Sequence, residues 1–218
     1  MTLDIVVRGR KQPASPSGRQ TVVLASASEI RARMLLHAGI SFETAPADID
    51  EAAVKLQARQ SQTQIDNAGI ALVLAQQKAA QASRNFPGRL VVGADQILDL
   101  DGEIYDKPVD LVQARSRLAR LSGRPHELIS AVSVARDGAE IWHHVDRARL
   151  WVRPLSDEFL GAYFDQLGDA AFTSPGSYQV EGIGIQLFDR IDGNYDTILG
   201  MPLLPLLKFL RTQKIIPS

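Results

Sequence analysis

Apolar and polar residues follow one another in blocks that predict strands and helices in alternation. Continuous or alternating apolar runs predict buried strands, and apolar residues at helical spacing, clearest over residues 109–123, predict amphipathic helices. The predicted strands are residues 21–26, a short stretch from 42, 89–100, 126–136, 139–152 and a stretch from 183; the predicted helices are residues 28–38, 64–84, 109–123, 156–168 and 203–211. A hairpin turn at 136–140 joins two of these strands, so we expect one α/β domain with a mixed sheet.

Composition narrows the class of protein. The chain has 218 residues, 45% of them hydrophobic, with a net charge of −1 and no cysteine. This profile gives no basic field to hold a nucleic acid, no thiolate metal site or disulfide, and no apolar run of membrane-spanning length. We therefore expect a cytoplasmic protein with neither nucleic-acid nor membrane partners. Residues 1–20 are expected to be a loose leader before a single domain at 21–218.

Two serines and an arginine follow the first predicted strand. Ser26 and Ser28 stand where the strand gives way to a helix, and Arg31 lies in the first turn of that helix. A helix amino terminus beyond a strand end offers free N–H groups to a phosphate, and hydroxyl and guanidinium groups add to such a site. The alternative is that Ser28 only caps the helix and Arg31 is solvated. Taken alone, this segment favours the alternative.

A carboxylate interrupts the apolar run at residues 89–100. Burying Asp95 is costly unless the group is paired or binds a metal, and Gly93 suggests that a ligand approaches the strand closely. Lys107 follows in a loop. A turn aspartate and a surface lysine explain the same residues equally well.

Three further groups carry charge. Asp50 and Glu51, with Asp48, form an acidic turn whose oxygens suit Mg²⁺, although solvated acidic turns are common. Lys78 lies in an Ala-rich helical stretch, where an exposed lysine is the simpler interpretation. Glu181 lies among glycines that indicate close backbone approach.

In this order, the segments resemble the Maf-like nucleotide pyrophosphatase family. The matching motifs include LASAS at 24–28, ADIDE at 47–51, VVGAD at 91–95 and Lys-Pro at 107–108, and the likeness extends from about residue 22 to 210. The resemblance implies an ITPase-like α/β fold with a central mixed sheet, flanking helices and an active-site cleft. It also implies a homodimer that uses Mg²⁺ or Mn²⁺ to hydrolyse nucleoside triphosphates to monophosphate and pyrophosphate.

Site residues are carried over from the family by position. The resemblance implies phosphate binding by Ser26, Arg31, Lys78 and Lys107, metal binding by Asp50 and Glu51, and a general base at Asp95. Two positions depart from the family pattern: Glu29 replaces a proline, and Asp106 replaces a glycine. We expect the second change either to weaken triphosphate binding, by placing a negative charge beside Lys107, or to add a metal ligand.

Three positions distinguish subgroups of the family by base. Here they are Ile30, Gln96 and Glu181, and the last two match the subgroup that prefers 7-methyl-GTP. A carboxylate accepts from the guanine N–H edge and favours the cationic methylated ring, whereas Ile30 lacks the aromatic face that would stack on the base. The expected role is removal of non-canonical nucleotides. The alternatives are a dTTP/UTP pyrophosphatase and a non-catalytic nucleotide-binding regulator of septation.

Overall fold

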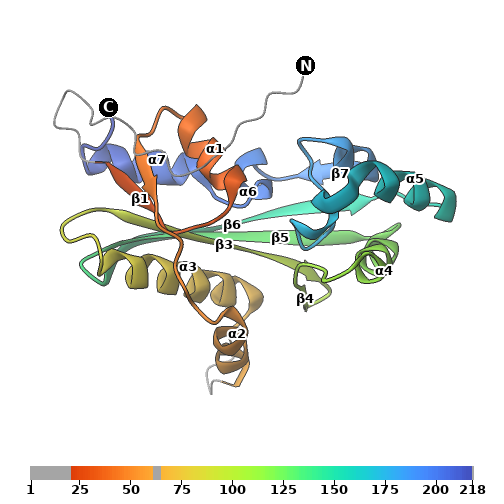
Figure 1. Ribbon diagram of the computed structural model, residues 1–218, viewed down its shortest axis with the longest axis horizontal. Coiled ribbons are helices and arrows are strands. Elements are labelled where there is room, and N and C mark those ends of the chain that lie inside the picture. The colour runs from red at the N-terminus through yellow and green to blue at the C-terminus, as the bar shows by residue number, and fades with distance from the viewer. Residues whose placement is uncertain (1–20, 61–64, 218) are drawn as a thin grey trace.

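The computed structural model describes residues 21–60 and 65–217, and the expected leader at 1–20 lies outside them. Within these residues a central sheet separates two layers of helices (Figure 1). The fold class predicted from the sequence, an α/β domain with a mixed sheet flanked by helices, is therefore confirmed. None of the described helices is both long and apolar enough to cross a membrane.

The sheet has seven strands in the order β2-β1-β3-β5-β6-β7, with β4 paired to β3. The strands are β1 (Val22–Leu24), β2 (Phe42–Thr44), β3 (Val91–Leu100), β4 (Glu103–Tyr105), β5 (Pro125–Arg136), β6 (Ala139–Val152) and β7 (Phe188–Asp192). β1 pairs in parallel with β2 and β3, and all other pairs are antiparallel. The predicted β5–β6 hairpin turns at Asp137 and Gly138, which both have positive φ angles, as its tight turn requires.

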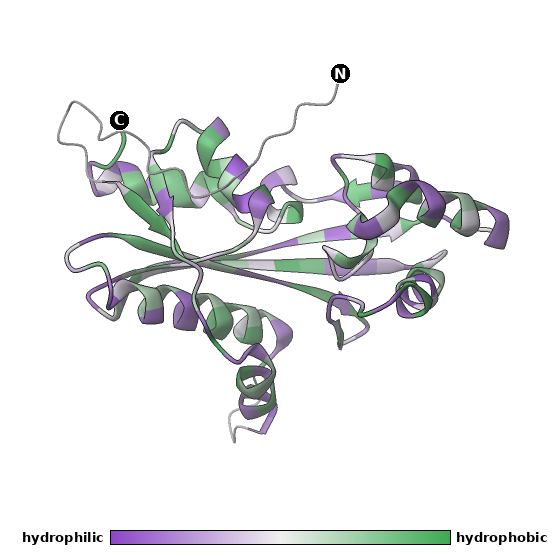
Figure 2. Cartoon of the chain, viewed as in Figure 1, coloured by the Kyte–Doolittle hydropathy of each residue, from purple (hydrophilic) through white to green (hydrophobic). Residues whose placement is uncertain are grey.

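The helices are α1 (Glu29–His37), α2 (Glu51–Gln60), α3 (Asn67–Ser83), α4 (Leu111–Leu121), α5 (Asp157–Leu167), α6 (Tyr195–Ile198) and α7 (Leu203–Thr212), with 3-10 turns at Gly168–Phe172 and Ile183–Leu187. α3 covers one face of the sheet, and α1, α6 and α7 cover the other (Figure 1). Hydrophobic residues run along the strands, whereas α3 shows both polar and apolar bands (Figure 2). Ile70 and Leu74 of α3 pack on Ile97 and Ile129 of the sheet.

Among the elements that differ from the sequence prediction are α2, β4 and the segment before β7. α2 was not predicted, and its first residue, Glu51, was assigned to an acidic turn. Only Val54 and Ala58 of this helix are buried, so its apolar pattern is weak. β4 has only three residues, too few for a visible alternation. The chain from residue 183 forms a 3-10 turn before β7, and a side chain at Gly184 would lie 2.5 Å from the carbonyl oxygen of Gln179. That close approach, which the glycines indicated, folds the segment back on itself in place of a strand.

Candidate active site

β3 carries the central residue of the site. Side chains alternate along a strand, so Asp95 projects toward α3, and Gln96 projects to the opposite face, toward α6. Gly93 lies under α3: a Cβ there would be 2.3 Å from the carbonyl oxygen of Ala75 and 2.6 Å from the amide nitrogen of Ala79. The expectation that Gly93 admits a ligand is therefore wrong, because the backbone of α3 occupies that space. Its role is to let α3 bring Lys78 against β3.

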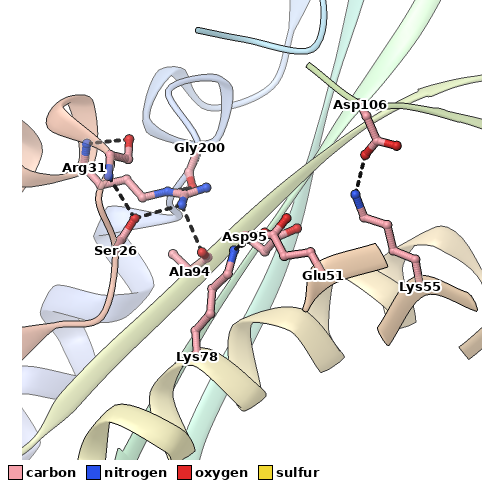
Figure 3. Close-up of polar contacts among 10 residues, drawn as sticks. Ser26, Arg31, Glu51, Lys55, Lys78, Ala94, Asp95, Asp106 and Gly200 are labelled. Carbon is pink, nitrogen blue, oxygen red and sulfur yellow. Dashed lines mark hydrogen bonds and ion pairs between the residues drawn. The ribbon is translucent and has the colours of Figure 1, made fainter. Parts of the chain in front are cut away.

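Lys78 lies between two carboxylates. Its Nζ atom is 2.7 Å from Oδ1 of Asp95 and 2.7 Å from Oε1 of Glu51 (Figure 3). The side chains of Asp95 and Lys78 are 8% and 11% exposed, whereas that of Glu51 is 46% exposed. An exposed helical lysine and a turn aspartate, the simpler interpretations from the sequence, are therefore wrong. We refer to these three residues as the Glu51–Lys78–Asp95 cluster.

The two carboxylates of the cluster differ in their proton affinity. Burial raises the pKa of Asp95 above its ordinary value, although the charges of Lys78 and Arg31 act in the opposite direction. Burial acts on Glu51 as well, but the hydrogen bond and charge of Lys78, with the charge of Lys55, hold its pKa below the ordinary value. Carboxyl groups with pKa values displaced in opposite directions are typical of acid–base sites.

Two nitrogens of the Arg31 guanidinium group are hydrogen-bonded to the protein. Its Nε donates to the carbonyl oxygen of Gly200 at 2.9 Å, and an Nη donates to that of Ala94 at 2.9 Å and to Oγ of Ser26 at 3.2 Å (Figure 3). Arg31 is thus not a solvated surface residue: it joins the loop after β1 and the interior of β3 to the segment before α7. Ser28 does cap α1, as one interpretation of the sequence held, because its side chain accepts from the amide of Arg31.

A cavity of about 860 Å³ collects nearly all of the predicted site residues. This volume suits a nucleotide-sized ligand. The lining includes every predicted residue except one: Ser26, Ile30, Arg31, Glu51, Lys78, Asp95, Gln96, Lys107 and Glu181. The structure therefore brings the candidate phosphate, acid–base and base-recognition residues into one cleft.

Asp50 is the predicted residue that does not line the cavity. Its side chain is exposed, and Oδ1 accepts from the amide nitrogen of Ala53 at 2.9 Å, which caps the start of α2. Within residues 21–60 and 65–217, no group of three or more Asp, Glu or His side chains is arranged to hold a metal ion. The metal role of Asp50 stays a prediction without geometric support, whereas Glu51 points into the site.

Gln96, one of the residues predicted to recognise the base, lies on the opposite side of β3 from Asp95. The amide nitrogen of Gln96 lies 3.0 Å from Oγ of Ser130 and from the carbonyl oxygens of Thr197 and Ile198, so its amide oxygen is the group left for a ligand. Glu181 forms a loose ion pair with Arg33, at 3.8 Å. Arg33 was missed from the sequence, where an exposed arginine on α1 gives no signal of its own.

Two further residues that line the cavity, Lys55 and Asp106, form a contact that the sequence did not predict. Lys55 on α2 forms an ion pair with Asp106, the residue that departs from the family pattern (Figure 3). Spacing could have indicated Lys55, because it lies one helical turn after Glu51 and on the same helix face. That signal depends on predicting α2, which the sequence pattern did not.

Comparison with known proteins identifies the family. The family model described as Maf-like protein matches residues 21–213. The chain belongs to the Maf-like protein family. The resemblance predicted from the sequence is thereby confirmed. The matched range includes every strand and helix that the structure describes.

Maf-like relatives match over most of their length. The chain is 49% identical over 195 residues to a 7-methyl-GTP pyrophosphatase of Brucella abortus biovar 1 (strain 9-941), covering 89% of this chain and 97% of that protein. It is 50% identical over 199 residues to a nucleoside triphosphate pyrophosphatase of Rhodopseudomonas palustris (strain BisB5), covering 91% of this chain and 96% of that protein. A solved nucleoside-triphosphatase / dITP/XTP pyrophosphatase of Mycobacterium abscessus has 16% identity and a TM-score of 0.40, covering 89% of this chain and 98% of that chain.

Proposed function

We propose that this Maf-like protein hydrolyses nucleoside triphosphates to nucleoside monophosphate and pyrophosphate. The observation that carries the proposal is the Glu51–Lys78–Asp95 cluster, which places a buried base and a lysine in a cavity large enough for a nucleotide. The printed functions of the two relatives, at about half identity over nearly the full chain, support the same reaction.

In the reaction, a water oxygen forms a bond to the α-phosphorus and the bond from that phosphorus to the α–β bridging oxygen breaks. Asp95 accepts the proton of the water, and its raised pKa makes it a better base than an ordinary carboxylate. Lys78 opposes the effect of burial on Asp95, and its positive charge would stabilise the negative charge that develops on the leaving pyrophosphate. Arg31, fixed by two backbone carbonyls, holds the wall of the cleft beside Ser26.

A divalent cation fits the donor set of the cluster. Glu51 and Asp95 supply two carboxylates, and Mg²⁺ or Mn²⁺ usually binds through one or two carboxylates together with substrate phosphates and water. When bound, such an ion would neutralise charge on the phosphate chain. The protein's own part is to hold the two carboxylates apart around Lys78, from α2 and β3.

We further propose a preference for 7-methyl-GTP over dTTP and UTP. Glu181 offers acceptors to the donor edge of a guanine and repels the carbonyl oxygens of a pyrimidine. Ile30 provides an apolar contact in the same cavity, without the stacking of an aromatic ring. A homodimer is expected from the family, and its size in solution is measurable by sedimentation.

The test is a product assay with the purified chain on 7-methyl-GTP, GTP, dTTP and UTP. We expect pyrophosphate and a monophosphate, activity that needs Mg²⁺ or Mn²⁺, and the highest kcat/KM on 7-methyl-GTP. Release of the terminal phosphate alone would make the chain a different phosphatase. Binding without turnover of any of these nucleotides would favour a non-catalytic regulator. A preference for dTTP and UTP would overturn the base assignment and leave the reaction intact.

A further inference from the structure

The basic side chains of the cavity are mostly engaged by the protein itself. Its lining contains five basic and five acidic residues. Arg31 donates to two carbonyls and to Ser26, and Lys78 lies between two carboxylates. Binding a triphosphate needs several cations around its oxygens. The residues so far assigned leave few positive groups to meet it.

Lys55 is placed to supply another positive charge. It follows Glu51 by one turn of α2, its side chain is only 17% exposed, and it lines the same cavity. Its charge also helps to lower the pKa of Glu51, so Lys55 lies close enough to act on the cluster, although its ammonium group contacts Asp106 (Figure 3). Val54 and Ala58 fix the rotation of α2 by packing with the core residues of α3.

Asp106 is the present partner of Lys55. It lies in the turn after β4, where its backbone carbonyl accepts from the guanidinium of Arg117 on α4. The turn is therefore anchored through its main chain, and the carboxylate, 63% exposed, contributes only the ion pair. An ion pair with one exposed partner is weak and screened by solvent. A highly charged phosphate chain can displace a single carboxylate from such a lysine.

We propose that Lys55 is a further phosphate-binding residue of this cleft, and that Asp106 occupies it when no nucleotide is bound. The inference rests on the proposed function. Triphosphate or pyrophosphate competes with Asp106 for Lys55, and binding turns the carboxylate out toward solvent. The carboxylate of Asp106 contacts Lys55, so this departure from the family pattern weakens phosphate binding through Lys55.

The experiment measures binding of inorganic pyrophosphate by calorimetry, with KM and kcat for a triphosphate in parallel. We expect Lys55→Gln to weaken pyrophosphate binding roughly tenfold and to raise KM more than it lowers kcat, because one charged hydrogen bond is lost. Lys55→Arg should bind close to wild type. Asp106→Asn should tighten binding, and the double variant should match Lys55→Gln, because Asp106 acts through Lys55.

Glu103→Gln is the matched control. Glu103 on β4 forms an ion pair with Arg120 on α4, as Asp106 does with Lys55, but Glu103 does not line the cavity. It should change neither affinity nor KM. Unchanged pyrophosphate binding by Lys55→Gln overturns the inference. Weaker binding by Asp106→Asn also overturns it, because the ion pair would then stabilise the structure of the site and not compete with phosphate. Melting temperatures verify that each variant is folded. If wild type neither binds pyrophosphate nor releases it from any triphosphate, the proposed function itself fails; an active wild type with unaffected Lys55 variants refutes this inference alone.

Discussion

The Nζ atom of Lys78 lies 2.7 Å from Oδ1 of Asp95, and both side chains are nearly buried. The contact joins α3 to β3 at the place where Gly93 lets the two backbones approach. A buried carboxylate with one lysine partner is sensitive to any change in that partner, because removing it leaves an uncompensated charge. The chemistry of the site and part of the stability of the domain therefore depend on the same pair.

Asp95→Asn should abolish turnover while leaving the fold intact. The amide is nearly isosteric but does not accept a proton at neutral pH, so we expect a loss of roughly 10²-fold or more in kcat. The measurement is pyrophosphate release, with circular dichroism to check folding. Asp99→Asn is the matched control: Asp99 lies on the same strand and bonds Asn67 and the amide of Gly102, outside the cavity lining. Retained activity of the Asp95 variant would remove the base assignment.

Lys78 and Lys107 should behave differently when their charge is removed. Lys78→Met leaves Asp95 buried without its partner, and we expect the free energy of unfolding to fall by roughly 3 kcal/mol. Lys107 lines the cavity but is exposed, so Lys107→Met should change the free energy of unfolding by less than about 0.5 kcal/mol. Both substitutions should raise KM for the triphosphate. Urea unfolding and steady-state kinetics measure the two effects, and equal stability of the two variants would contradict the structure.

The acid limb of the pH–rate profile should report Asp95. Burial raises the pKa of Asp95, and a base acts only when ionised, so kcat/KM should fall as the pH decreases through a value above the ordinary ~3.9 of an aspartate. Lys78 lowers the pKa of Asp95, so Lys78→Gln should move the limb to higher pH. Lys107→Gln should lower the plateau without moving the limb. A limb that stays in place when Lys78 is changed would assign it to another group.

Stability should decrease in mild acid because of His126. The ring is buried and shares a hydrogen bond of 2.6 Å with the hydroxyl of Tyr178, and burial lowers the pKa of His126 from 6.5 to about 4. The unfolded chain binds a proton below pH 6.5 that the folded chain does not, so stability is full above that pH. It is lost as the pH falls toward 4, by about 3 kcal/mol.

His126→Gln removes this titrating group and keeps a polar side chain beside Tyr178. We expect its unfolding free energy to change less between pH 7 and pH 4 than that of wild type. The comparison of the two urea denaturation series at each pH is the measurement. Parallel pH dependence in the two proteins would show that His126 is not the group responsible.

Glu181→Gln should erode the base preference more than the overall rate. An amide can donate to the pyrimidine carbonyls that a carboxylate repels, so the ratio of kcat/KM for 7-methyl-GTP to that for UTP should fall. Arg33→Gln is the companion variant: it frees Glu181 from its ion pair without altering the acceptor, and should keep or increase the ratio. An unchanged ranking in Glu181→Gln would exclude this residue from base selection.

The sequence predicted the sheet well because its long strands carry strong signals. β3, β5 and β6 have buried apolar runs, and the β5–β6 turn carries the Asp-Gly pair that a tight hairpin needs. α2 and β4 could not be predicted in the same way, because one buries few residues and the other is held by a single neighbouring strand. Local pattern is weak wherever tertiary contacts decide the conformation.

The sequence predicted which residues belong to the candidate site but not which of them contact one another. Resemblance supplied nine residues that the structure places in one cavity. Which acid meets which base depends on contacts between segments far apart in the chain, such as Glu51 with Lys78 or Arg31 with Gly200. Asp50 and Glu51 are neighbours in sequence, yet one caps a helix and the other enters the cleft. The spacing of acidic residues in this turn does not indicate which of the two caps the helix and which points into the cleft.

Asp95 and Gln96 are consecutive residues whose side chains leave β3 on opposite faces. The alternation of one strand thus places the proposed base on the α3 side and the contacts to α6 on the other, within one cleft. On the proposed assignment, Glu181 can be exchanged without removing a contact of the Glu51–Lys78–Asp95 cluster, because its ion pair is with Arg33. The pleat of a single strand therefore gives this scaffold a way to acquire new nucleotide substrates while conserving its reaction.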